Sequence, residues 1–417
     1  MRLIKTLISA TSIAICLAFT AAPAFAAEYK VIRYFNSGVG QSPGAGLIFD
    51  ASGNLYSTTV EGGAGGSGTV FELSPGAGGK WVETVLYSFC AQSNCADGAN
   101  PYSGLVFDSA GNLYGTTTAG GKDNNGVVFQ LAPGSNGSWT EHVLYRFCSV
   151  AACDDGATPW ATLTFDSSGS LYGTTFSGGS IDRGVAFKLS RARDGDWHET
   201  VLHNFGVGKD GYNPISGLVF DSAGNLYGTT PHGGDVSRPN CGSLGCGTVF
   251  ELSPKSTHYT EHVIYSFKGL AGSGPIAGLI LDASGNLYGT ASTGGAHGDG
   301  AVFELSPGAA GWTETTLHSF DGSWKDPTGS LILDGSGNLY GTCQGGGVYN
   351  LGIVFELSPE QDGLWAETVL HSFNNSGGTY PSANLIFDGN GNLYGTAYEG
   401  GSACAGAGCG TVFEITP

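Results

Sequence analysis

The chain has 417 residues, of which 12% are charged, and 35 acidic against 16 basic side chains give a net charge of −19. Nucleic acids and anionic membranes attract basic surfaces, so this balance argues against both as partners. The 72 glycines do not recur at every third position, which excludes collagen. They are interleaved with branched and aromatic residues, which indicates a folded chain.

Residues 1–26 have the features of a secretory signal peptide. Arg2 and Lys5 precede a mostly apolar run over 7–19, and Ala24 and Ala26 are small residues at the cleavage-determining positions. The apolar run is too short to span a bilayer comfortably. We expect cleavage near Ala26, followed by a single domain over 27–417. The mature protein is expected to be secreted or periplasmic, monomeric and not inserted in a membrane.

One motif, Phe-Asp-x-x-Gly-Asn-Leu-Tyr-Gly-Thr-Thr, occurs seven times with small variations. A period near fifty residues built from strand-like segments indicates one supersecondary unit copied around a ring or along a stack. The aspartates of the motif, which we interpret as turn formers that bond to nearby backbone amides, are Asp50, Asp108, Asp166, Asp221, Asp282, Asp334 and Asp388.

Each unit contains four strand-like segments, which in the second unit cover 105–108, 113–117, 126–131 and 139–147. Short runs rich in Val, Tyr, Phe and Thr, separated by Gly and Pro, are typical of strands and turns. No segment has a sustained helical periodicity. A proline stands shortly before the first strand of every unit, outside the ladder of hydrogen bonds.

The last unit lacks its fourth strand, and residues 29–35 ahead of the first unit repeat the pattern of that missing strand. We therefore predict an all-β fold, a seven-bladed β-propeller with four antiparallel strands per blade, in which the N-terminal strand completes the last blade. A closed ring protects the strand edges, whereas an open solenoid would need atypical capping units. The expected blades are 43–89, 101–147, 159–205, 214–267, 275–320, 327–373, and 381–417 plus 28–35.

The combination Gly-Asn-Leu-Tyr-Gly-Thr-Thr, then Gly-Gly, then Gly-Thr-Val-Phe-Glu-Leu resembles the tandem repeat of the exported bacterial choice-of-anchor GloVer-repeat proteins. It is found, for example, at 224–230 and 247–252. The strand-turn-strand core more distantly resembles NHL-type propellers. The family resemblance implies export, often with a C-terminal surface anchor, and no general activity. The final strand pattern here is followed by only two residues, so we expect free secretion or a periplasmic location instead of anchoring.

Four pairs of cysteines share one spacing: Cys90/Cys95, Cys148/Cys153, Cys241/Cys246 and Cys404/Cys409. Local pairs of this kind in an exported protein predict disulfides. Zinc is the competing interpretation, but a zinc site needs four ligands and no histidine accompanies the pairs at a regular spacing. Cys343 takes a position that threonine holds in other units, so we expect a buried free thiol there.

Strand order predicts two different ends of the ring. One end carries short, uniform turns, and the other carries the second-to-third loops and the blade linkers, which vary in length and hold all four cysteine pairs. Loops on a rigid scaffold carry function, so the ligand-binding candidates are residues of the variable end that break the repeat. These candidates are His232, Arg238, Arg183, His297, Tyr349, Trp160 and Trp324.

Ionisable residues that recur from unit to unit are interpreted as structural. His203, His318 and His371 stand where other units have tyrosine, and one position holds Glu83, Glu141, Glu199, Glu261, Glu314 and Glu367. A catalytic acid pair needs two carboxylates in unlike environments at one place, whereas a residue repeated once per blade is spread around the ring. We therefore assign no catalytic residue, no metal ligand and no cofactor.

The leading hypothesis is an exported binding or scaffold protein that recognises an extracytoplasmic glycan or protein through its disulfide-braced loop face. One alternative is a lyase or hydrolase acting on a polysaccharide or lactone at the channel mouth. It requires that His232, Arg238, Arg183 or His297 meet there. Another alternative is a purely structural envelope protein.

Overall fold

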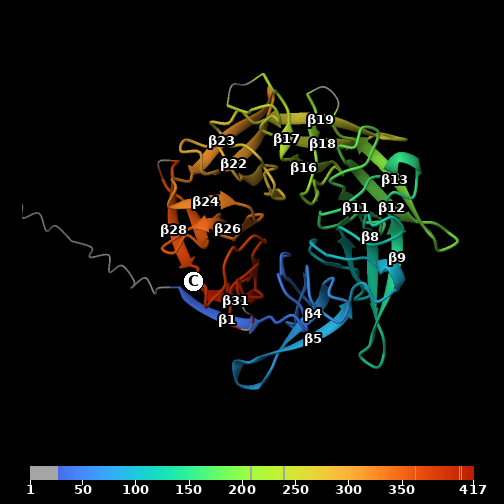
Figure 1. Cartoon of the computed structure of the whole chain (residues 1–417). Coiled ribbons are helices and arrows are strands. Elements are labelled where there is room, and N and C mark those ends of the chain that lie inside the picture. Colours follow the sequence, from blue (N-terminus) through green and yellow to red (C-terminus); the bar gives the residue numbers. More distant parts are fainter. Residues whose placement is uncertain (1–26, 207–208, 238–239, 362, 403, 405) are drawn as a thin grey trace, which may run out of the picture.

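The computed structural model describes residues 27–206, 209–237, 240–361, 363–402, 404 and 406–417 (Figure 1). Seven antiparallel sheets surround a central axis as the blades of a propeller, which confirms the predicted fold. The last strand of each blade lies at the circumference, where Figure 1 labels β5, β9, β13 and β28. The predicted signal peptide lies outside the described residues.

The blades follow one another along the chain. Blade 1 contains β2 (Ile48–Phe49), β3 (Leu55–Thr59), β4 (Thr69–Pro75) and β5 (Trp81–Ser88), and blade 2 contains β6 (Val106–Phe107), β7 (Leu113–Thr117), β8 (Val127–Pro133) and β9 (Trp139–Arg146). Blade 3 contains β10 (Thr164–Phe165), β11 (Leu171–Thr174), β12 (Val185–Arg191) and β13 (Trp197–Asn204). Blade 4 contains β15 (Val219–Phe220), β16 (Leu226–Thr230), β18 (Thr248–Pro254) and β19 (Tyr259–Ser266).

Blade 5 contains β20 (Ile280–Leu281), β21 (Leu287–Ala291), β22 (Ala301–Gly308) and β23 (Gly311–Ser319). Blade 6 contains β25 (Ile332–Leu333), β26 (Leu339–Gly346), β27 (Ile353–Pro359) and β28 (Trp365–Ser372), and β24 (Trp324–Pro327) pairs with β26. Blade 7 contains β29 (Ile386–Phe387), β30 (Leu393–Ala397), β31 (Thr411–Thr416) and β1 (Glu28–Tyr34). The remaining elements are the paired strands β14 (Gly211–Tyr212) and β17 (His232–Gly233), and the 3-10 turns η1 (Ala77–Gly79), η2 (Ser93–Cys95) and η3 (Ala151–Cys153).

The first strand of each blade has only two residues, which is shorter than the sequence predicts. In blade 2 the prediction covers 105–108, but the strand ends at Phe107 because Asp108 already belongs to the following turn. The Asp108 N–H donates to the carbonyl of Asn112 at 3.0 Å, which closes that turn.

The motif aspartate holds this turn together in every blade. In blade 4, Asp221 Oδ1 accepts the N–H groups of Ala223 and Asn225, at 2.8 and 2.9 Å, and Oδ2 accepts the Asn225 amide and the Tyr227 hydroxyl. Partial burial alone raises the pKa of this carboxyl, but the hydrogen bonds to its ionised form outweigh burial and lower the pKa. The interpretation of these aspartates as turn formers is confirmed.

Neighbouring blades pack through seven equivalent pairs of phenylalanines. In each pair the residue that follows an outer strand meets the third strand of the next blade edge to face, with ring centroids 5.0–5.3 Å apart. Such a pair contributes about 0.5–1.5 kcal/mol beyond the burial of its area. The pairs are Phe35–Phe71, Phe89–Phe129, Phe147–Phe187, Phe205–Phe250, Phe267–Phe303, Phe320–Phe355 and Phe373–Phe413.

The N-terminal strand closes the ring, as predicted. β1 pairs antiparallel with β31, with Val31 opposite Phe413 and Tyr34 opposite Thr411. Arg33 of β1 forms an ion pair with Glu83 of β5, so blade 7 also contacts blade 1 through charged side chains. Closure leaves no gap between the first and last blades, and it removes the strand edges that an open array would expose.

All four predicted disulfides are present, and Cys343 is a buried free thiol. Disulfides persist in oxidising compartments, so their number indicates an extracytoplasmic environment. Among the residues that the structure describes, no helix has the length and apolar character needed to cross a membrane.

The disulfide between Cys404 and Cys409 has the predicted pairing and lies partly in the core. Cys409 is only 3% exposed and belongs to the core cluster that contains Phe35 and Leu47. The reason is its place in the chain, two residues before β31, where its carbonyl accepts the Ser42 N–H at 2.9 Å.

Candidate functional site

Each blade linker bends sharply before it reaches the channel wall. The repeat proline packs on the glycine that precedes the third strand of the preceding blade; a Cβ on Gly126 would lie only 2.7 Å from Cδ of Pro159. The residue before the proline has a positive φ in every linker, which is uncommon for a β-branched residue such as Thr158. A conformation of this kind persists only where the surrounding packing enforces it. The residue after the proline is therefore held in a fixed position.

The residues after the seven prolines converge on one cavity at the mouth of the channel. They are Gly44, Tyr102, Trp160, Ile215, Ile276, Thr328 and Ser382, and with Gln344 they line about 270 Å³. We call these eight residues the mouth cavity. An adjoining space of about 140 Å³ is lined in part by Thr162, Ser330 and Asn384, each from a different blade linker.

Aromatic side chains form an arc along one side of the mouth cavity. The ring centroids of Tyr102 and Trp160 lie 5.3 Å apart, and those of Trp160 and Phe176 lie 5.7 Å apart. The hydroxyls of Tyr102 and Tyr398 are 3.4 Å apart, which extends the arc to blade 7. Trp160 stays 36% exposed, so its ring offers a surface to a ligand.

A larger cleft of about 570 Å³ lies beside the mouth cavity and shares Ile215 and Ile276 with it. Its wall includes His232 and the loop that the disulfide between Cys241 and Cys246 closes. The two cavities therefore lie next to each other on the variable end of the ring.

Arg183, Tyr212 and His232 form a stack at this cleft. The guanidinium carbon of Arg183 lies 4.4 Å from the Tyr212 ring centroid, and the rings of Tyr212 and His232 lie 5.3 Å apart and nearly parallel. Burial, and then the Arg183 charge, lower the pKa of His232, so its imidazole is neutral at neutral pH. Its Nδ1 is buried and has no hydrogen-bond partner among the described residues.

The structure brings some of the sequence-predicted site residues together and separates others. Trp160 lines the mouth cavity, and Arg183 and His232 approach each other with Tyr212 between them. His297 and Tyr349 are exposed and line neither cavity. Arg238 lies outside the described residues, as does the side chain of Trp324, whose backbone begins β24.

Sequence reasoning missed most of the mouth cavity, including Tyr102, Ile215 and Ile276. The available signal was the position after the repeat-wide proline, which differs between units while its surroundings are repeated. The convergence of seven such positions becomes visible only when the units are aligned with one another and placed around a ring.

The mouth cavity and its adjoining space have no charged side chain in their linings, and His232 is the one ionisable residue lining the larger cleft, among the residues that the structure describes. A charged ligand would lose its hydration there without gaining an ionic partner. The linings of these cavities therefore suit an uncharged ligand.

The recurrent ionisable residues meet across blade boundaries, in agreement with their structural interpretation. The Tyr265 hydroxyl bonds to Glu314 at 3.1 Å, and His318 lies 3.3 Å from Glu367.

One boundary is different, because His203, Asp210 and Glu261 each offer a ligand atom to one point, and these atoms lie within 4.8 Å of one another. Among the described residues this is the one group of three that could hold a metal ion. The sequence analysis dismissed His203 because it replaces a tyrosine.

Comparison with known proteins gives a family and a fold. A family model described as the Gloeobacter/Verrucomicrobia repeat matches residues 16–241 and 236–417, and none of the curated proteins matches the chain.

Among solved structures, the periplasmic gluconolactonase PpgL of Pseudomonas aeruginosa is 16% identical, with 87% of this chain and 98% of that chain covered and a TM-score of 0.51. A Bacteroides uniformis protein assigned as a 6-phosphogluconolactonase is 16% identical, with coverages of 78% and 84% and a TM-score of 0.49. A Dyadobacter fermentans protein of unknown function is 10% identical, with coverages of 94% and 100% and a TM-score of 0.47. At 16% identity the likeness to PpgL concerns the fold alone.

Proposed function

The chain belongs to the Gloeobacter/Verrucomicrobia repeat family, and from that premise we propose that it is an exported β-propeller that binds a neutral glycan at its channel mouth. The observation that carries the proposal is the convergence of seven post-proline residues on one uncharged cavity, with the rings of Tyr102 and Trp160 on its wall. Small-ligand sites combine apolar and aromatic walls with a few polar groups that fix orientation.

Neutral sugars match this lining with both their apolar C–H faces and their hydroxyl groups. The C–H faces of a pyranose ring are apolar and pack on flat aromatic rings such as Trp160. Their hydroxyls need donors and acceptors, which Thr328, Ser382 and Gln344 supply in the same cavity. The net charge of −19 repels acidic polysaccharides, which favours uncharged ones.

The space next to the mouth cavity holds only about 140 Å³, which favours a chain end or a short branch over a threaded polymer. The Thr162 hydroxyl accepts the Gly104 N–H at 3.0 Å, and the Ser330 hydroxyl accepts the Gly278 N–H at 2.9 Å. These hydrogen bonds fix the side chains of Thr162 and Ser330 in the wall of this space.

A glycan array tests the proposal with the mature protein, residues 27–417, beside a Tyr102→Ala/Trp160→Ala double variant. We expect the wild type to bind a subset of neutral glycans and the double variant to lose that binding while it keeps its thermal unfolding temperature. Binding confined to acidic glycans, or binding that the double variant retains, would overturn the proposal. An array without any bound glycan would also overturn it and would favour a protein partner or a structural envelope role.

A lactone hydrolase is the second candidate, and His232 is the observation that favours it. Its imidazole is neutral, has a buried Nδ1 without a hydrogen-bond partner among the described residues, and lines the larger cleft, so it has the properties of a general base for water. The fold likeness to a gluconolactonase makes glucono-1,5-lactone a suitable first substrate. We expect the wild type to hydrolyse the lactone faster than the spontaneous rate, and His232→Gln not to do so. Equal hydrolysis rates for the wild type, His232→Gln and buffer without protein would reject this candidate.

A further inference from the structure

The boundaries between blades 1 to 4 repeat one arrangement of three ionisable residues. At the first boundary the Tyr87 hydroxyl donates to Asp97 at 2.8 Å, and at the second the Tyr145 hydroxyl donates to Asp155 at 2.7 Å. The third member is a glutamate of the next blade, Glu141 or Glu199, whose electrostatic influence reaches each tyrosine.

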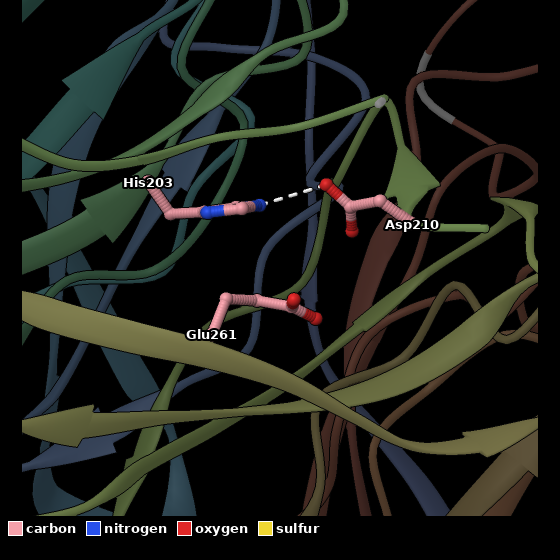
Figure 2. Close-up of side chains that lie close together, drawn as sticks. All are labelled: His203, Asp210 and Glu261. Carbon is pink, nitrogen blue, oxygen red and sulfur yellow. Dashed lines mark hydrogen bonds and ion pairs between the residues drawn. The ribbon is translucent and has the colours of Figure 1, made fainter. Parts of the chain in front are cut away.

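At the third boundary a histidine replaces the tyrosine. Figure 2 shows His203 of β13, Asp210 of the blade linker and Glu261 of β19 pointing toward one another. His203 Nε2 lies 2.7 Å from Asp210 Oδ2, and the ligand atoms of all three residues lie within 4.8 Å. Tyrosine is a poor ligand at neutral pH, whereas neutral imidazole and two carboxylates are ligands that divalent transition metals accept.

The aspartates of the three boundaries differ in how their oxygens are satisfied. Asp97 uses both oxygens, because Oδ2 accepts the Ala91 N–H and Oδ1 accepts the Gln92 N–H. Asp210 Oδ2 accepts the Gly206 N–H, but Oδ1 is buried and has no hydrogen-bond partner among the described residues. The Asp210 side chain is only 7% exposed, so this unpartnered oxygen is costly to bury.

The linkers themselves also differ. Those that carry Asp97 and Asp155 are each closed by a disulfide, Cys90–Cys95 and Cys148–Cys153. The linker that carries Asp210, residues 206–213, contains no cysteine. Of these three linkers, only the one that carries Asp210 has no disulfide. A bound cation would therefore supply the cross-link that this linker lacks.

We propose that His203, Asp210 and Glu261 form a site for a divalent transition-metal ion of the zinc class, which ties the linker to blades 3 and 4. Three protein ligands leave at least one position of a tetrahedral ion for water. The cation would neutralise the charge of both carboxylates and would give the unpartnered Asp210 Oδ1 an interaction. This site is separate from the mouth cavity, so the proposal stands or falls independently of glycan binding.

The test uses mature protein without a histidine tag, stripped with a chelator and titrated with zinc chloride by isothermal calorimetry. We expect one zinc per chain and an unfolding temperature that rises with zinc concentration. X-ray absorption should show nitrogen and oxygen ligands without sulfur, because the one free cysteine among the described residues, Cys343, is buried elsewhere.

His203→Tyr is the matched variant, because it installs the residue that the two preceding boundaries carry and is expected to fold. It should weaken zinc binding by roughly 100-fold or more, and Glu261→Gln should weaken it by at least roughly 10-fold. A wild type that binds no zinc would overturn the proposal, as would a folded His203→Tyr variant that binds zinc with unchanged stoichiometry and affinity.

Discussion

The two ends of the ring differ in how strictly their residues repeat from blade to blade. At the turn end, the same aspartate bonds the same backbone positions in each unit, and Asp50 and Asp221 make equivalent contacts at nearly equal distances. At the mouth end, one position after a repeat-wide proline holds glycine, tyrosine, tryptophan, isoleucine, threonine or serine. Both ends belong to the same scaffold. The repeated aspartates are therefore positions that the fold requires, and the variable post-proline residues are positions that it leaves available for a ligand.

Trp160→Ala should have the largest effect, and it should act on binding alone. Truncation of a central aromatic contact costs about 2 kcal/mol or more, which corresponds to a roughly 30-fold loss of affinity for the array ligand. Titration calorimetry measures the change. Tyr349→Ala is the matched control, because Tyr349 lies on the same end of the ring but is 59% exposed and does not line the mouth cavity. Equal losses in both variants would contradict the assignment of the site.

Asp221→Ala should show the reverse pattern, a loss of stability without a loss of affinity. It removes the acceptors of four hydrogen bonds within one turn, and we expect the free energy of unfolding to fall by about 1–2 kcal/mol. Urea denaturation measures this change. Asp221→Asn retains one carbonyl acceptor and should lose less. Weakened ligand binding by a folded Asp221→Ala protein would break the separation between the two ends.

The blade boundaries lie between these two ends, and their contribution to stability should depend on pH. Burial, and then the Asp155 charge, raise the pKa of Glu199 to about 8. The unfolded chain ionises this residue near its ordinary value of 4.5, so the folded protein binds more protons between these values. Stability therefore falls as the pH rises through this window. Glu199→Gln stays neutral and should lose less stability between about pH 5 and about pH 8.5; an unchanged slope would contradict this account.

The sequence predicts the scaffold well because its determinants are local and repeated. Asp221 and Gly224 specify a turn, and the spacing of the motif and the pattern of residues 29–35 specify the blade number and the closure. The length of the first strand was wrong because Asp108 bonds within the turn and not within the ladder.

The cysteines show the same limit of local reasoning. Their pairing and the free Cys343 follow from spacing and from the position in the repeat. The burial of Cys409 does not, because it depends on Phe35 and Leu47, which only ring closure brings to that side of blade 7.

The candidate site is harder to predict because its members are distant in sequence and individually ordinary. Ile215 and Ile276 resemble any linker residue until the ring places them beside Trp160. In the sequence, His203 is only a replacement for a tyrosine. The structure shows that Asp210 Oδ2 of the following linker lies 2.7 Å from its Nε2. The irregular loop residues His297 and Tyr349 line neither cavity. Departure from the repeat in an exposed loop carries no information about which side chains converge.

A crystal structure of the mature protein with the tightest neutral glycan from the array tests the central claim most directly. The account predicts a sugar ring packed on Trp160, with Tyr102 in contact and hydroxyls bonded to Thr328, Ser382 or Gln344. A glycan bound at the aspartate turns or along the outer strands, with the mouth cavity free of it, would contradict the account.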